Sequence, residues 1–99
     1  MERLIVKVDQ DLLDLIPGFL KNKKNDINKI KTALPLGDYE TVRVTGHNMK
    51  GSGAGYGFLE ISEIGAGIET AAGKQDHEQI IYLLNQLTDY LDRVSFEPE

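Results

Sequence analysis

Only two histidines occur in this sequence of 99 residues, and one of them has charged neighbours at helical spacing. Residues three and four apart share one face of a helix, so Arg43, Lys50 and Gly51 would lie beside His47. A neutral imidazole nitrogen is a nucleophile near neutral pH, and adjacent cations can offset the charge on phosphoryl oxygens. This pattern suits phosphoryl transfer, and it also fits an ordinary exposed histidine between two cations. His77 falls in a first helical turn and is interpreted as a solvated residue.

Composition narrows the class of protein. The net charge of −5 argues against nucleic acid as a partner, and the absence of cysteine excludes disulfides and thiolate metal sites. No apolar run approaches the roughly 18–20 residues that a membrane helix needs. The opening segment MERLIVKVD becomes acidic too soon for a secretory signal. These features favour a soluble cytoplasmic protein that contacts neither membrane nor nucleic acid.

The charge is distributed unevenly along the chain. Residues 1–50 hold nine Lys/Arg and seven Asp/Glu, whereas residues 51–99 hold two and nine. The basic excess lies in one predicted helix and has two interpretations, a solvated helix face or an electrostatic guide for an acidic protein partner. The residues concerned are Lys21, Lys23, Lys24, Lys29 and Lys31. In the acidic half, Glu60 and Glu63 lie three apart on one helix and are interpreted as solvated charges.

Helical periodicity extends from residue 9 to residue 94 and predicts an all-α protein. A short helix over residues 9–16 would end at Pro17, which can open the next helix. Asp38 and Asp76 are suited to cap two further helices, and Gly73 ends the helix between them. The glycine-rich stretch 51–57 is expected to close the helix that carries His47. Each helix has one apolar stripe. The inward positions are Leu20, Ile27, Ile30 and Leu34; Tyr39, Val42, Gly46, Met49 and Gly53; Ile61, Ile64, Ile68 and Ala72; and Ile80, Leu84, Leu87, Leu91 and Val94.

Four such helices with short connections predict an antiparallel up-down four-helix bundle with a short extra N-terminal helix. The length fits a single domain, residues 1–99, whose bundle core covers about 9–94. Residues 4–8 and 94–96 resemble strands rather than helices. In an up-down bundle both segments would lie at the same end, where they could pair.

The segment GHNMKGSGAGYGF, residues 46–58, resembles the signature of histidine-containing phosphotransfer (HPt) domains. That signature runs small-His-x-hydrophobic-Lys-Gly-small-small, followed by a glycine. Further similarity occurs at VDQDLL (8–13), FLKN (19–22), GDYE (37–40) and IETAA (68–72), so the resemblance covers about residues 8–94. Val44 and Thr45 depart from the arginine and leucine that usually precede the histidine.

The resemblance implies roles for individual residues. His47 matches the phosphoacceptor, and Lys50 matches the lysine that assists with phosphoryl charge. Glu69 stands twenty-two residues after His47, where the related domain of chemotaxis kinases has a glutamate hydrogen-bonded to the histidine. Arg43 is a weaker candidate for the same charge-offsetting role. The expected partner-docking positions are Gly46, Gly51, Ser52 and Ala54.

By the same resemblance, the protein would be a phosphocarrier without ATP-dependent kinase activity of its own. It would accept a phosphoryl group from a receiver-domain aspartate or from a histidine kinase catalytic domain, and would pass it to another receiver domain. No cofactor or metal is expected in the chain, and the Mg²⁺ that the reaction needs would belong to the partner. A second hypothesis is a helical interaction module that binds a signalling partner without phosphotransfer.

Overall fold

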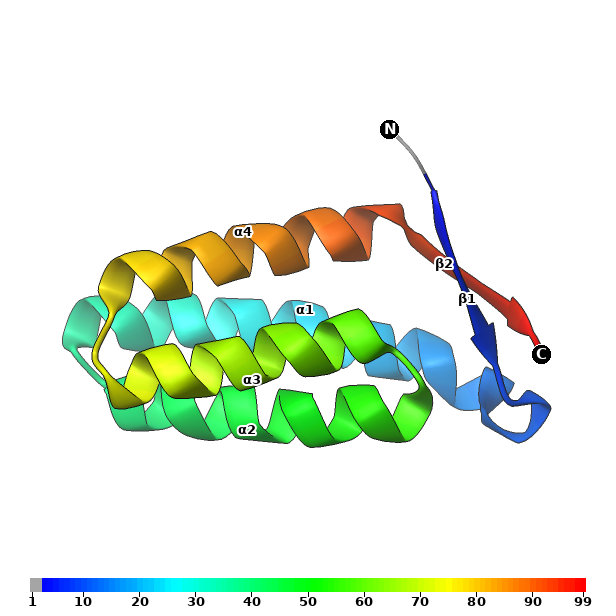
Figure 1. Ribbon diagram of the computed structural model, residues 1–99, viewed down its shortest axis with the longest axis horizontal. Helices are drawn as coiled ribbons and strands as arrows, with labels where there is room; N and C mark the ends of the chain where they lie inside the picture. The colour runs from blue at the N-terminus through cyan, green and yellow to red at the C-terminus, as the bar shows by residue number, and fades with distance from the viewer. Residues whose placement is uncertain (1–2) are drawn as a thin grey trace.

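Four antiparallel helices form an up-and-down bundle in residues 3–99, the part of the chain that the computed structural model describes (Figure 1). This architecture confirms the predicted all-α four-helix bundle. The helices are α1 (Ile16–Ala33), α2 (Tyr39–Tyr56), α3 (Leu59–Gly73) and α4 (His77–Arg93). Two short 3₁₀ helices and two short strands complete the chain: η1 (Gln10–Leu15), η2 (Leu34–Leu36), β1 (Leu4–Val8) and β2 (Val94–Pro98).

The helix ends follow local sequence. The carboxylate of Asp38 accepts a hydrogen bond from the backbone N–H of Thr41 at 3.1 Å, which satisfies a free donor at the start of α2. Asp76 does the same for Gln79 at the start of α4, at 3.2 Å. At the other end of α2, Gly57 adopts φ +85°, a left-handed conformation that favours glycine. The glycine-rich stretch 51–56 is therefore helical, and α2 ends only at Tyr56.

The extra N-terminal helix is present but has 3₁₀ geometry. η1 begins after Asp9, whose side chain accepts a hydrogen bond from the backbone N–H of Asp11 at 2.9 Å. It passes directly into α1 at Ile16, so Pro17 stands in the first turn of α1. A proline is tolerated there because its missing N–H would have had no partner inside the helix.

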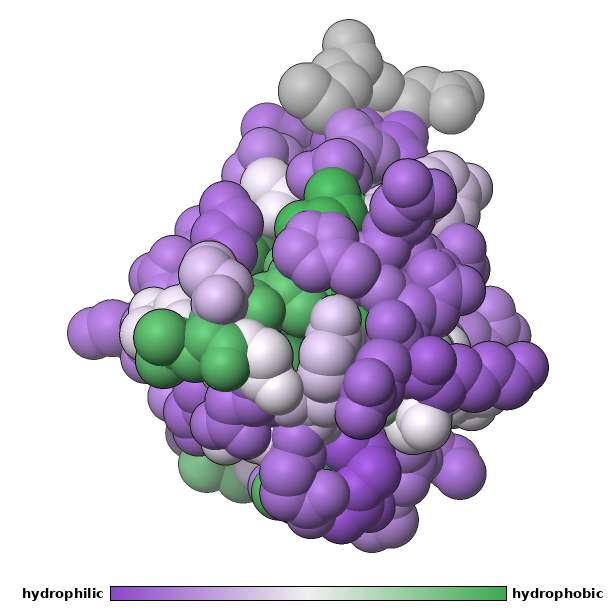
Figure 2. Space-filling view, turned by 90° about the vertical axis from the view of Figure 1, so that its left-hand side faces the viewer, coloured by the Kyte–Doolittle hydropathy of each residue, from purple (hydrophilic) through white to green (hydrophobic). Residues whose placement is uncertain are grey.

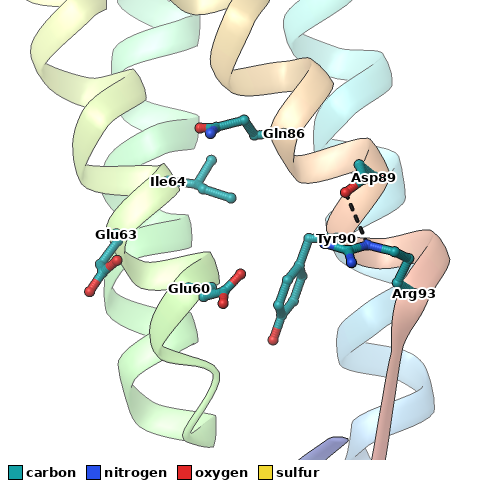
Figure 3. Close-up of a pocket in the computed structure, with 7 residues that line it drawn as sticks. All are labelled: Glu60, Glu63, Ile64, Gln86, Asp89, Tyr90 and Arg93. Carbon is teal, nitrogen blue, oxygen red and sulfur yellow. Dashed lines mark hydrogen bonds and ion pairs between the residues drawn. The ribbon is translucent and has the colours of Figure 1, made fainter. Parts of the chain in front are cut away.

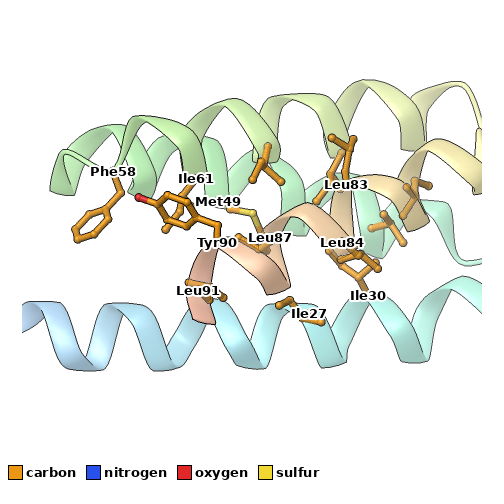
Figure 4. Packing of buried hydrophobic residues seen from close by; sticks show 14 of the residues in the cluster. Ile27, Ile30, Met49, Phe58, Ile61, Leu83, Leu84, Leu87, Tyr90 and Leu91 are labelled. Carbon is orange, nitrogen blue, oxygen red and sulfur yellow. The ribbon is translucent and has the colours of Figure 1, made fainter. Parts of the chain in front are cut away.

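The apolar stripes of the four helices meet in one core (Figure 4). At its centre, Met49, Ile61 and Leu87 are completely buried. At the end where α2 turns into α3, the Phe19 ring lies 4.6 Å from that of Tyr56 and 5.3 Å from that of Phe58, measured between centroids. These aromatic contacts anchor the start of α1 against the α2–α3 connection.

The two strands pair in parallel, in a register that runs from Leu4 opposite Val94 to Val8 opposite Pro98. An even number of antiparallel helices returns the chain to its starting end, which is why the terminal segments meet (Figure 1). This confirms the predicted pairing.

The opposite end of the bundle carries the α1–α2 and α3–α4 connections and is shown in Figure 2. A small apolar area there is surrounded by hydrophilic side chains, and Leu36 of η2 is 78% exposed. Among the helices of residues 3–99, none has the length and apolar character required to cross a membrane.

Candidate phosphoacceptor site

His47 lies in the middle of α2 with 63% of its side chain exposed. Its Nδ1 is 2.9 Å from Oε2 of Glu69, which reaches across from α3 and has 25% of its side chain exposed. A carboxylate only accepts hydrogen bonds, so Nδ1 carries the hydrogen in this contact. In the neutral ring the lone pair then resides on Nε2. The contact therefore orients the imidazole and leaves one nucleophilic nitrogen facing solvent.

This contact depends on an unusually close approach of α2 and α3. A Cβ added to Gly46 would lie 2.8 Å from the backbone nitrogen of Glu69, and one added to Gly65 would lie 2.6 Å from that of Lys50. A Cβ on Gly53 would lie 2.6 Å from the backbone nitrogen of Ser62. Only glycine fits at these three positions, because the obstructing atoms belong to the facing backbone. We call Gly46, Gly53 and Gly65 the glycine seam.

The seam explains how Glu69 reaches His47. Gly46 directly precedes the histidine, and its missing side chain lets the backbone of Glu69 approach α2. A further tie comes from Ser62, whose hydroxyl donates to the carbonyl of Lys50 at 2.8 Å. The sequence placed Gly46 and Gly53 on the inward stripe of α2 but gave no role to Gly65. The packing role of Gly65 could have been inferred from its position beside Ile64, at the edge of the apolar stripe of α3.

Gly46, one of the predicted docking positions, is buried in the α2–α3 interface. Gly51 and Ala54 are exposed, as a docking role would require. A Cβ added to Gly51 would meet no atom within 4 Å, outside its own stretch of helix. Gly51 is therefore free of packing constraints, in contrast to the glycine seam.

Ser52 points away from His47 and toward α1. Its hydroxyl accepts a hydrogen bond from Nζ of Lys23 at 3.1 Å, and the same Nζ contacts Oδ2 of Asp26 at 3.0 Å. Lys23 is only 6% exposed and its ammonium lies 5.3 Å from the centroid of the Phe19 ring. Both interpretations of the basic face, a solvated face or a guide for an acidic partner, are wrong for Lys23, since it is a buried, paired cation between α1 and α2. Ser52 serves this contact and does not face the surface around His47.

The two cations near His47 differ in how they are engaged. Arg43 Nε donates to Oε2 of Glu40 at 3.1 Å, and this hydrogen bond raises the pKa of the guanidinium above its usual value. Lys50 is exposed and forms no salt bridge with any acidic side chain of residues 3–99. Of the two cations, Lys50 is therefore the one whose charge is left unpaired within residues 3–99. Within the same residues, no three His, Cys, Asp or Glu side chains cluster as metal ligands.

A family model described as the Hpt domain matches residues 14–96. Hpt domains are phosphocarriers rather than kinases, and they interact with receiver domains and kinases in phosphorelays. A comparison with curated proteins and with solved structures finds no significant match. The family match spans most of the 99 residues and includes the exposed histidine and its glutamate partner, and the chain therefore belongs to the Hpt domain family.

Proposed function

We propose that His47 accepts a phosphoryl group on Nε2 and passes it to the aspartate of a receiver domain. The Nε2 lone pair attacks phosphorus in a receiver phosphoaspartate or at the terminal phosphate that a kinase domain presents. The P–O bond to the donor breaks, and the electron pair leaves with the carboxylate or the nucleotide. The reverse reaction, with a second receiver aspartate as nucleophile, delivers the group.

The observation that carries this proposal is the hydrogen bond between His47 Nδ1 and Glu69. When Nε2 forms its bond to phosphorus while Nδ1 keeps its hydrogen, the ring gains positive charge. A carboxylate on Nδ1 offsets that charge as it develops and keeps the ring oriented. Lys50 lies one turn further along α2 and offsets the negative charge of the phosphoryl oxygens.

A direct assay distinguishes phosphotransfer from the competing function, a helical module that binds a partner without phosphotransfer. A receiver domain phosphorylated with a radioactive label is mixed with the full chain, and the label on each protein is followed over time. Phosphotransfer requires the label to move to this protein. The adduct should be labile in acid and stable in base, because protonation of a phosphorylated nitrogen makes it a better leaving group. A receiver that binds but keeps its label would support the non-catalytic module.

Removing the lysine beside His47 is expected to slow transfer. Lys50→Ala should lower the transfer rate by about tenfold to a hundredfold, the loss of one electrostatic contact in the transition state. Lys31→Ala is the matched control, since Lys31 is exposed in the groove between α1 and α4. Rapid-quench measurements of label transfer would give both rates. Equal transfer rates for the two variants would show that Lys50 does not assist phosphoryl transfer.

Glu69→Gln should have a smaller effect, below about tenfold, because an amide oxygen still accepts from Nδ1 but carries no charge. Single-turnover transfer rates, measured alongside ¹⁵N spectra of the imidazole, would test this. The neutral ring should keep its hydrogen on Nδ1 in the variant. A variant that exchanges label as fast as the parent would show that the carboxylate charge contributes nothing to transfer.

A side chain at Gly51 is expected to obstruct the receiver. Gly51 lies one turn after His47 on the same face and has open space around it, so Gly51→Gln should leave the fold intact. Holding the two surfaces apart by about 1 Å can cost on the order of a hundredfold in rate. Gly18→Gln in α1 is the control, because a side chain at Gly18 is also unobstructed but lies on a different helix from His47. The next residue, Phe19, packs against Tyr56 at the C-terminal end of α2. Transfer at the parental rate in Gly51→Gln would mean that the receiver does not dock over this face.

A further inference from the structure

A second surface feature lies between α3 and α4, away from His47. It is a hollow of about 280 Å³, large enough for one extended side chain. Figure 3 shows the residues that line it. They are Glu60, Glu63 and Ile64 of α3, with Gln86, Asp89, Tyr90 and Arg93 of α4.

The rim of this α3–α4 hollow carries excess negative charge. Asp89 is neutralised by Arg93, whose Nε lies 3.0 Å from Oδ2 of the aspartate. Glu60 and Glu63 are exposed, and neither forms a salt bridge within residues 3–99. Two carboxylates at the edge of the hollow are therefore left without a cation.

One polar group that lines the hollow, the hydroxyl of Tyr90, has no hydrogen-bond partner within residues 3–99. Tyr90 is 4% exposed, and its ring extends from α4 toward Glu60 (Figure 3). Its hydroxyl forms no hydrogen bond with any group of residues 3–99, and it is not fully enclosed. Burial, together with the negative charge of Glu60, raises the pKa of Tyr90 to about 12, so the phenol stays neutral at physiological pH. A neutral phenol beside carboxylates offers a hydrogen-bond acceptor at the one part of this buried side chain that stays accessible, its hydroxyl oxygen.

Carboxylates around a phenol oxygen are the chemistry that recognises a guanidinium or ammonium group, because each of them accepts hydrogen bonds from the cation. No three possible metal ligands cluster within residues 3–99, which favours a side chain over a metal ion as the occupant. We propose that the α3–α4 hollow docks an arginine or lysine side chain of a partner protein. α3 suits a basic partner, since it contains three glutamates and neither lysine nor arginine.

This docking site is separate from the phosphoacceptor. Glu60 precedes Glu69 by nine residues, which is about 13 Å along a helix. Glu69 faces α2 and His47, whereas Glu60 lines a hollow shared with α4. A partner held at the hollow would therefore leave Nε2 of His47 open, so the site would serve to recruit a protein and not to transfer the phosphoryl group.

The test uses the full chain and two short peptides, acetyl-Gly-Arg-Gly-amide and its citrulline counterpart, which has nearly the same shape but no charge. Titration followed by ¹H–¹⁵N spectra should show saturable shifts at Glu60, Tyr90 and Arg93 with the arginine peptide only. Glu60→Gln together with Glu63→Gln should weaken this binding by more than about tenfold. Tyr90→Phe should weaken it by about tenfold, the loss of one hydrogen bond donated by the charged guanidinium.

Two controls keep the outcome decisive. Asp92→Asn removes the same type of charge from α4 outside the hollow and should leave binding unchanged. His47→Gln should also leave it unchanged, which separates this proposal from the phosphotransfer function. Equal shifts with the citrulline peptide, or equal affinity in the double variant and in Asp92→Asn, would overturn the proposal. Shifts spread evenly over the acidic surface would overturn it as well.

Discussion

Replacing His47 with glutamine is expected to abolish phosphorylation while leaving the protein folded. The His47 side chain is 63% exposed and its only hydrogen bond within residues 3–99 is to Glu69. Exposed substitutions of this kind change the free energy of unfolding by about 0.5 kcal/mol or less. Glutamine has no nucleophilic ring nitrogen, so label from a phosphorylated receiver should not transfer. Thermal unfolding and the transfer assay, measured on one preparation, give the two results.

His77→Gln is the matched control, since His77 is an exposed histidine in the first turn of α4. It should accept phosphate at the parental rate. In the parent, the phosphoryl group should reside on Nε2, because Nδ1 is engaged by Glu69. Nitrogen-15 and phosphorus-31 spectra of the adduct would identify the bonded atom. Label retained by His47→Gln, or a phosphorus bonded to Nδ1, would contradict the proposed role of His47.

The bundle was predictable because its determinants are local in sequence. Asp38 and Asp76 mark helix starts through the hydrogen bonds that their carboxylates accept, and these residue types are favoured there whatever surrounds them. The spacing of Ile80, Leu84 and Leu87 identifies the buried side of α4 in the same way. The face that groups His47 with Lys50 follows from the same helical geometry.

Contacts between helices were predictable only in part. Helical periodicity identifies the buried face of each helix, but it does not give the distance between two helices. Glu69 was placed beside His47 by family resemblance, since residues twenty-two apart have no fixed relation in sequence. Gly46 was assigned to the docking surface, although it lies where α2 meets α3. Lys23 was grouped with an exposed basic face, although an aspartate one turn away and the hydroxyl of Ser52 satisfy its charge in the interior. Both residues are covered by a neighbouring helix, which the periodicity of a single helix does not reveal.

Alanine substitutions at two glycines are expected to have opposite effects on stability. In α3, a Cβ on Gly65 would lie 2.6 Å from the backbone nitrogen of Lys50 and 2.8 Å from the carbonyl oxygen of Gly46. Backbone atoms cannot rotate aside, so Gly65→Ala must separate α2 from α3, at a cost of about 1–3 kcal/mol or more. In α2, Gly51 has no such obstruction, and Gly51→Ala should gain up to about 1 kcal/mol of helix stability.

Thermal unfolding resolves these changes, because 1 kcal/mol shifts the Tm of a domain of this size by about 4–8 °C. Gly65→Ala should lower the Tm and Gly51→Ala should raise it or leave it unchanged. The two variants should also differ at the site. Separating α2 from α3 lengthens the contact between His47 and Glu69, so Gly65→Ala should slow transfer even at temperatures where it is fully folded, whereas Gly51→Ala keeps that contact. An unaltered Tm in Gly65→Ala would mean that the helices are not in backbone contact. A folded Gly65→Ala that transfers at the parental rate would show that the glycine seam stabilises the bundle without setting the position of Glu69.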